Sequence, residues 1–242
     1  MNQLTRAAAR FVLPSVCLAC RVAPADDFFR GGVCAACWES LPFPEDARCG
    51  RCDETLPAAP GASVCGRCLI DPPAFERLHA AAPYAGSARA ILLAFKFQGA
   101  DYLAARLAEV LATRLPNPRV DEVAAVPSTR RARRRRGYHP ADALGAAVAR
   151  RLDLPLSRSR LAKIRDTEIQ SRLPASERAA NVRRAFRVAG RPPAHVLLVD
   201  DVATSGATAR ECAARLAEAG ARTVTVWCFA RASRADLGPE AD

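Results

Sequence analysis

The sequence predicts an α/β fold, built on a parallel twisted sheet and preceded by a small cysteine-rich domain. Eight of the ten cysteines lie before residue 70. From residue 75 onward, apolar strands alternate with amphipathic helices. One of these strands runs into two adjacent carboxylates, Asp200 and Asp201, where a small-residue turn opens a helix. We therefore expect two domains, residues 1–72 and residues 73–242.

The N-terminal cysteines form four CxxC pairs, separated by intervals of 13, 11 and 12 residues. A CxxC turn aims two thiolates at one point, and two such turns complete a tetrahedral S4 shell for zinc. Large apolar residues are few in this region, so a metal has to take the place of a core. The predicted ligands are Cys17, Cys20, Cys34, Cys37, Cys49, Cys52, Cys65 and Cys68.

Zinc competes with three other interpretations of these cysteines. A disulfide scaffold requires an oxidising compartment, and no export signal indicates one. A thioredoxin-like redox site needs only one CxxC pair, whereas an S4 iron site is chemically possible. We expect two structural Zn²⁺ ions. Pairing the first CxxC with the second and the third with the fourth closes two short loops and is favoured, although interleaved pairing stays open.

The first 20 residues imitate a signal peptide only loosely. Their apolar stretch is short, contains Pro14 and runs into the first cysteine pair. We interpret it as a short amphipathic helix. No apolar run approaches the roughly 20 residues of a membrane helix. The sequence therefore predicts a soluble cytoplasmic protein without membrane insertion.

Downstream of residue 75 the pattern predicts a helix-covered parallel sheet. Cys212 and Cys228 fall on a predicted helix and strand, where a core role is expected. Strands are predicted over residues 78–86 (with a turn), 120–127, 194–201 and 222–230, and helices over residues 87–97, 101–115, 141–152 and 205–220, with a break near Gly99.

The acidic pair lies where open α/β sheets bind ligands, beyond the carboxyl end of a strand. The following turn, residues 203–208, opens a helix, and its backbone N–H groups suit a phosphate because Gly206 allows a close approach. Thr204, Ser205 and Thr208 add hydroxyl donors. The turn lacks the lysine of a P-loop and the GxGxxG spacing of a dinucleotide fold. Carboxylates beside a phosphate cradle favour a sugar phosphate over an ordinary capped turn.

The stretch VLLVDDVATSGAT (residues 196–208) resembles the phosphoribosyl pyrophosphate (PRPP) signature of type I phosphoribosyltransferases. Nearly the whole chain resembles the ComF family, because the CxxC pairs, DEVAAVP, RRARRRRGY, TEIQ, ERAANVRRAF and the acidic loop follow in the family's order. The resemblance implies a double zinc ribbon followed by a sheet of the type I phosphoribosyltransferase type. It also implies recognition of PRPP with Mg²⁺, followed by phosphoribosyl transfer to an unidentified acceptor or by sensing without turnover.

The resemblance also assigns roles. It implies that the acidic pair holds the ribose hydroxyls and that residues 204–208 hold the 5′-phosphate. It also implies that the strand end at residues 126–129 contacts pyrophosphate and that residues 165–178 form a loop that closes over the site. The catalytic candidates are Asp200, Asp201, Arg136 and Arg178; the PRPP-binding candidates are Val199, Asp200, Asp201, Ala203, Thr204, Ser205, Gly206, Ala207, Thr208, Pro127, Ser128, Thr129, Thr167 and Gln170.

One segment departs from the family pattern. ComF proteins usually show RGFNQ after the arginine-rich stretch, and here residues 136–140 read RGYHP. This puts in doubt any family role for the Asn and Gln side chains. The three histidines, His79, His139 and His195, are scattered, so surface or capping roles are expected and no Ser/His/Asp triad.

The basic residues are concentrated between residues 128 and 191. This segment holds 18 basic and five acidic residues, a balance of 18 − 5 = +13 against +11 for the whole chain. Its arginine run fits a pyrophosphate clamp, a nucleic-acid backbone patch or a solvated loop. The resemblance implies a role in natural transformation, with single-stranded DNA and a competence helicase as partners. The candidate nucleic-acid contacts are Arg130, Arg131, Arg133, Arg134, Arg135 and Arg136.

Overall fold

The protein is described by a computed structural model. The structure describes residues 16–25, 32–44, 47–57, 61, 63–128, 137–165, 167 and 177–232. Within these ranges, no helix combines the length and the apolar character that a bilayer crossing requires. The predicted N-terminal helix lies outside the described residues.

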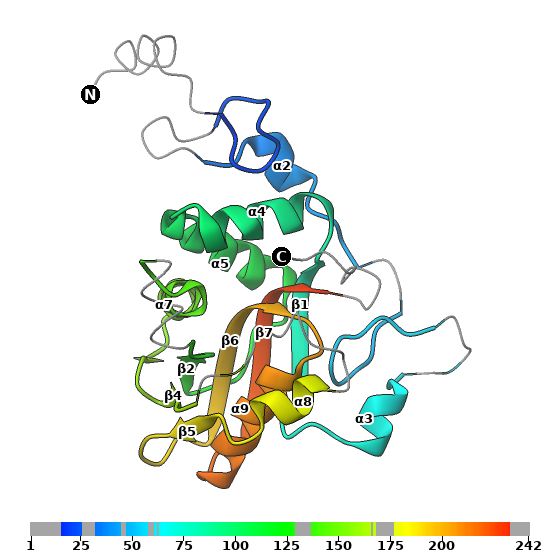
Figure 1. Cartoon of the computed structure of the whole chain (residues 1–242), viewed down its shortest axis with the longest axis vertical. Coiled ribbons are helices and arrows are strands. Elements are labelled where there is room, and N and C mark those ends of the chain that lie inside the picture. The colour runs from blue at the N-terminus through cyan, green and yellow to red at the C-terminus, as the bar shows by residue number, and fades with distance from the viewer. Residues whose placement is uncertain are drawn as a thin grey trace.

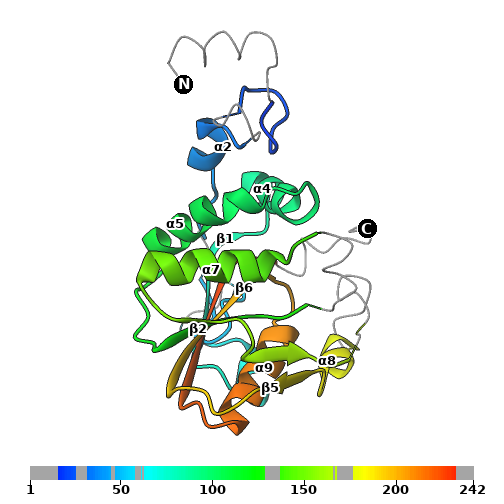
Figure 2. The same ribbon diagram turned by 90° about the vertical axis from the view of Figure 1, so that its left-hand side faces the viewer.

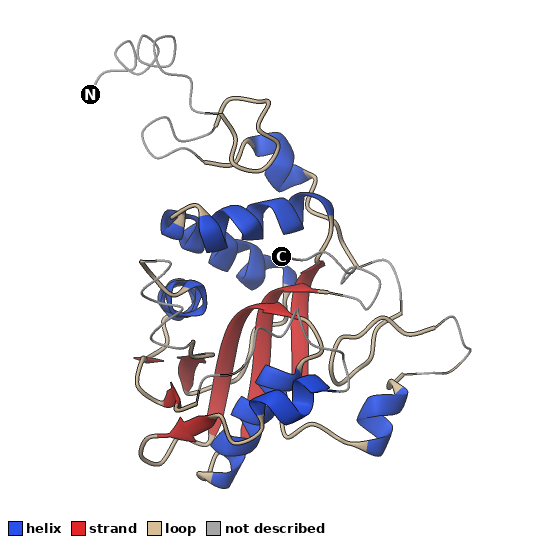
Figure 3. Ribbon diagram, viewed as in Figure 1, coloured by secondary structure: helices blue, strands red, loops and turns tan. Residues whose placement is uncertain are grey.

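Five parallel strands form the central sheet, in the order β1-β7-β6-β2-β3 (Figures 1 and 3). The two long strands at its centre, β6 and β7, are apolar and buried over most of their length, as expected of a sheet covered on both faces. The strands are β1 (Arg77–Pro83), β2 (Glu122–Ala125), β3 (Leu156–Ser157), β6 (His195–Ala203) and β7 (Thr223–Arg231). The predicted α/β fold is confirmed.

Helices cover both faces of the sheet (Figure 2). On one face lie α4 (Gly86–Phe97), α5 (Ala104–Arg114) and α7 (Pro140–Leu152), and on the other lie α8 (Glu177–Val182) and α9 (Ala207–Glu218). The predicted break near Gly99 separates α4 from the 3-10 turn η1 (Asp101–Leu103) that leads into α5, and Gly99 has a φ of +65°. A side chain would strain this backbone conformation.

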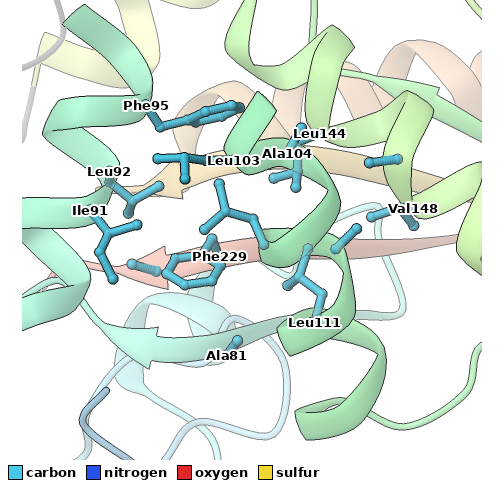
Figure 4. Packing of buried hydrophobic residues seen from close by; sticks show 14 of the residues in the cluster. Ala81, Ile91, Leu92, Phe95, Leu103, Ala104, Leu111, Leu144, Val148 and Phe229 are labelled. Carbon is cyan, nitrogen blue, oxygen red and sulfur yellow. The ribbon is translucent and has the colours of Figure 1, made fainter. Parts of the chain in front are cut away.

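The core beneath α4, α5 and α7 is made of interlocking aliphatic and aromatic side chains (Figure 4). Phe95 of α4, Leu111 of α5 and Phe229 of β7 belong to this cluster, and all three are fully buried. Such burial stabilises the fold by roughly 1.5–3 kcal/mol per large side chain. Cys212 and Cys228 are fully buried in the core on the opposite face, as predicted.

Several short elements were not predicted. β3 has two residues, and β4 (Leu161–Lys163) and β5 (Phe186–Val188) pair antiparallel as three-residue strands. Such runs are too short to show a periodicity. In addition, β6 continues past the acidic pair to Ala203, because β7 pairs with it as far as Arg231.

The described part of the cysteine-rich region includes the short helices α2 (Ala35–Glu39), which lies beyond α4 (Figure 1), and α3 (Gly66–Ile70). Its segment around the third CxxC pair packs against the sheet. On the edge strand β1, the Leu78 N–H donates to the Arg51 carbonyl at 2.8 Å and the Ala80 N–H donates to Asp53 Oδ2 at 2.9 Å. This segment therefore covers an otherwise open sheet edge. The boundary between residues 72 and 73 stays a prediction.

Candidate functional site

The eight N-terminal cysteines gather into two groups of four. Their Sγ atoms lie within 4.8 Å of one another in each group. The first group joins the first and second CxxC pairs, and the second group joins the third and fourth, so the favoured sequential pairing is confirmed. The groups are Cys17, Cys20, Cys34 and Cys37, and Cys49, Cys52, Cys65 and Cys68.

The geometry of both groups fits zinc. The Sγ–Sγ distance is 3.9 Å for Cys17 and Cys37, and 3.6 Å for Cys52 and Cys65. A tetrahedral site with Zn–S bonds of ~2.3 Å has edges of ~3.8 Å. None of the ten cysteines forms a disulfide, which agrees with the metal interpretation. Backbone N–H groups of Ala23 and Val22 lower the pKa of Cys20 to about 6 and so favour the thiolate that a metal requires.

Each cysteine group belongs to the core on one face of the sheet. Cys17 and Cys34 pack with the cluster beneath α4 and α5, whereas Cys52 and Cys68 pack with the cluster beneath α9. In Figure 1, α2 accordingly lies beyond α4 at one end of the molecule, and α3 lies at the other side near α8 and α9. The second group is thus close to the helix that follows the acidic pair.

Asp200 and Asp201 lie near the carboxyl end of β6. Asp201 is 8% exposed and is one of two buried charged residues in the part of the chain that the structure describes, the other being Arg231. Burial and then the neighbouring charge of Asp201 raise the pKa of Asp200 to about 8. Asp200 therefore holds its proton at neutral pH until a ligand supplies positive charge or hydroxyl donors.

The acidic pair has a cationic partner that the sequence analysis did not identify. Lys96, near the end of α4, places Nζ 2.9 Å from Asp201 Oδ1. Lys96 is one of only two lysines among 36 basic residues. This rarity was the only feature of the sequence that could have marked it as a site residue. The other lysine, Lys163, donates from Nζ to Thr167 Oγ1 at 2.6 Å. Thr167 is one of the predicted PRPP-binding residues.

The turn after β6, the predicted phosphate-binding segment, is held by several hydrogen bonds. Gly206 has a φ of +71° and precedes α9, and the Ala207 N–H donates to Ser205 Oγ at 3.3 Å. The carbonyl of Thr204 accepts from Arg231, and the carbonyl of Ser205 accepts from Arg67 Nη1 at 2.9 Å. The carbonyls of Thr204 and Ser205 are thus both occupied.

The predicted pyrophosphate strand lies next to β6. The Val126 N–H donates to the Val199 carbonyl at 2.9 Å, which places Pro127 and Ser128 beside the acidic pair. Because α7 and α9 lie on opposite faces, β2 and β6 flank the point where the strand order reverses, the usual crevice for ligands in such sheets.

The remaining predicted residues are only partly described. Thr129, Gln170 and the arginine run at residues 130–136 lie outside the described residues, and Arg178 belongs to α8 without a described side chain. Of the histidines, His139 caps α7, because its Nδ1 accepts from the Asp142 N–H at 3.2 Å. This capping role, at a position where the sequence departs from the family pattern, was among those expected.

Comparison with known proteins relates the chain to a named group. A model of the double zinc ribbon domain matches residues 8–69. DNA utilization protein YhgH of Salmonella typhi is 33% identical over 232 residues, which cover 90% of this chain and 98% of that protein. Competence protein F of Haemophilus influenzae is 31% identical over 215 residues, covering 84% and 92%. Among solved structures, the protein TT1426 from Thermus thermophilus matches over 55% of this chain and 74% of its own, at 21% identity and a TM-score of 0.31.

These relatives match along almost their whole length, and the cysteine groups correspond to the matched ribbon domain. The chain therefore belongs to the ComF family, the family of DNA utilization protein YhgH and Competence protein F, and carries that family's double zinc ribbon at its N-terminal end.

Proposed function

We propose that this protein binds PRPP together with Mg²⁺ at the carboxyl end of β6 and acts in the uptake or use of DNA. The observation that carries the first part is the acidic pair, a buried Asp201 beside a partly exposed Asp200, followed at once by a turn whose Thr204 and Ser205 carbonyls accept from Arg231 and Arg67. Carboxylates accept hydrogen bonds from ribose hydroxyls, and the N–H groups of residues 204–208 suit the 5′-phosphate.

Each neighbouring element contributes to this site. Residues 127 and 128, beside Val199, supply the contact to pyrophosphate. Carboxylate and phosphate oxygens are the ligands that Mg²⁺ prefers, so the donor set fits this ion. When bound, Mg²⁺ would neutralise charge on the leaving pyrophosphate. Arg136 and Arg178, the catalytic candidates that the family resemblance implies, would add positive charge to stabilise the departing pyrophosphate.

The chemistry needs no nucleophilic side chain. C1 of PRPP loses pyrophosphate through an oxocarbenium-like state, and the protein orients the sugar, steadies the departing charge and excludes water. A protein that only senses PRPP needs the same binding residues but no acceptor position. Release of pyrophosphate, with and without candidate acceptors, separates these two modes.

The link to DNA rests on the names of the relatives and on the charge of this chain. Those relatives are called a DNA utilization protein and a competence protein. Residues 128–191 carry the +13 balance, which suits a polyanion. We propose that the arginine run at residues 130–136 contacts single-stranded DNA, within a soluble protein that works with a competence helicase.

The PRPP proposal is tested by titration calorimetry with and without added Mg²⁺. Omitting Mg²⁺, rather than adding a chelator, leaves the cysteine sites loaded. We expect binding only with Mg²⁺, and its loss in Asp200→Asn/Asp201→Asn. Asp121→Asn is the matched control, because this exposed carboxylate lies at the opposite end of β6, where it accepts from the His195 N–H at 2.9 Å. Unchanged affinity in the double variant refutes the proposal.

The DNA proposal is tested by fluorescence anisotropy of a labelled single strand at several salt concentrations. Arg133→Ala/Arg134→Ala is compared with Arg150→Ala/Arg151→Ala, which removes two exposed charges at the end of α7. Loss of two phosphate contacts lowers the salt slope by roughly 1.4. Equal slopes in both variants, or no binding at low salt, contradict the proposal.

A further inference from the structure

The second group of cysteines, here called the second metal group, lies against the turn at residues 204–206, here called the anion-binding turn. Arg67 stands between the ligands Cys65 and Cys68, and its Nη1 donates to the Ser205 carbonyl at 2.9 Å. This hydrogen bond joins residues 138 positions apart in the chain. The backbone that encloses the metal site therefore also carries a side chain that holds the turn.

An ion pair between a buried arginine and a partly exposed glutamate makes a second connection. Arg231, the last residue of β7, is 3% exposed. Its guanidinium pairs with Glu54, two residues after the ligand Cys52, and also donates to the Thr204 carbonyl. Because a buried arginine left without its carboxylate is costly, Glu54 and Arg231 hold each other in place.

These two carbonyl contacts determine where the N–H donors of the turn point. In a trans peptide the C=O and the following N–H are antiparallel, and the structure contains no cis peptide among its described residues. Fixing the Thr204 carbonyl directs the Ser205 N–H to the opposite side, and fixing the Ser205 carbonyl does the same for the Gly206 N–H. Both donors belong to the predicted phosphate cradle.

A third arginine connects the metal group to the helix that continues the turn. Arg210, in the first turns of α9, donates from Nη2 to Cys68 Sγ at 3.0 Å and from Nη1 to the Asp71 carbonyl at 2.7 Å. A zinc ion with four thiolates has a net charge of about −2, which attracts such cations. The start of α9 is thus attached to the same metal shell.

We propose that the second metal group positions the anion-binding turn, residues 204–206, through Arg67, Arg210 and Arg231, so that occupancy of this metal site sets the affinity of the turn for phosphate. These arginines are positioning residues. The first metal group has no such connection among the described contacts: the segment that follows it meets α4 and α5 instead, as in the bond from Ser87 Oγ to the Ser40 carbonyl at 2.9 Å.

Hydrogen–deuterium exchange of the peptide over residues 203–209 tests the proposal without any ligand. Cys68→Ser removes a ligand of the second group, and Cys37→Ser removes the equivalent ligand of the first, each lowering zinc content by one of the two expected ions. We expect exchange of this peptide to be at least roughly tenfold faster in Cys68→Ser and unchanged in Cys37→Ser. A peptide over β2 reports on general unfolding.

Arg67→Ala keeps the test decisive if Cys68→Ser does not fold. We expect Arg67→Ala to retain both metals and still to lose protection in the turn, with partial recovery in Arg67→Lys. Unchanged protection in Arg67→Ala and Cys68→Ser, or equal loss in Cys37→Ser, overturns the proposal. The effect on phosphate affinity rests on the proposed PRPP function. If loss of the second metal still exposes the turn but the protein binds no PRPP, the PRPP function is refuted and the positioning of the turn by the metal group stands.

Discussion

Lys96 of α4 and Asp201 of β6 form an ion pair, with 2.9 Å between Nζ and Oδ1, at the carboxyl end of the sheet. Both side chains are largely buried, at 19% and 12% exposure. The pair therefore joins the helical layer on one face to the strand that carries the candidate site. Removing either charge leaves the other poorly solvated.

Lys96→Met should lower the free energy of unfolding at pH 7 by about 2 kcal/mol, because Asp201 would lose its charged partner. Chemical denaturation measures this difference. Lys96→Arg is the control that keeps the charge, and Lys96→Met/Asp201→Asn should recover much of the loss. A Lys96→Met variant as stable as the wild type would show that the ion pair does not form.

Asp200→Asn should change the pH dependence of stability. The pKa of Asp200 is raised to about 8 in the folded protein, above its ordinary value of 3.8. The folded state therefore holds a proton that the unfolded state has lost, and wild-type stability falls as pH rises through this window. Denaturation between pH 6 and pH 9 should show the advantage of Asp200→Asn growing by up to about 1.4 kcal/mol per pH unit and levelling off above pH 8. A difference independent of pH contradicts the raised pKa.

Arg114→Ala should destabilise the protein by about 2–3 kcal/mol. The Arg114 guanidinium donates to the carbonyls of Leu41, Pro42 and Ala81 and lies 3.7 Å from the centre of the Phe43 ring, so it joins the cysteine-rich region to α5 and β1. Losing these contacts leaves buried carbonyls unpaired. Arg106→Ala on the same helix is the control: it removes a half-exposed pair with Glu109, which contributes roughly 0.5 kcal/mol, and a ring contact to Trp38 at 5.8 Å, but leaves the three carbonyl contacts of Arg114 in place. Equal losses in thermal denaturation would contradict the proposed role of Arg114.

Metal analysis should find two zinc ions per chain, since the two groups of four thiols have tetrahedral spacing. Both groups belong to the core, so removing the metal with a strong chelator should abolish cooperative thermal unfolding rather than only lower its midpoint. Native mass spectrometry counts the ions. A single ion per chain, or visible absorption from iron bound to thiolates, would contradict this assignment.

The parts of the fold that the sequence predicts are those with long, regular patterns. β6 and α9 follow from an apolar run and a helical repeat around the acidic turn. The CxxC spacing identifies the metal ligands and favours their sequential pairing, which the structure confirms. The two-residue β3 and the β4–β5 pair carry no comparable pattern, because strands this short form only where tertiary packing selects them.

The connections around the site could not be predicted for a different reason. The contact from Arg67 to Ser205 spans 138 residues and the pair of Arg231 with Glu54 spans 177. Arginine is so common in this chain that no single one is marked by its sequence context. Lys96 was detectable only as a rare lysine, and its role depends on where α4 ends relative to β6.

The central claim is that the acidic pair and the turn after it bind PRPP as one site. A crystal structure determined after soaking with PRPP and Mg²⁺ tests it most directly, with residues 199–208 as the region to inspect. We predict the 5′-phosphate against the turn at residues 204–208 and the ribose hydroxyls against Asp200 and Asp201. PRPP bound away from β6, or an empty turn at saturating PRPP, would contradict the claim.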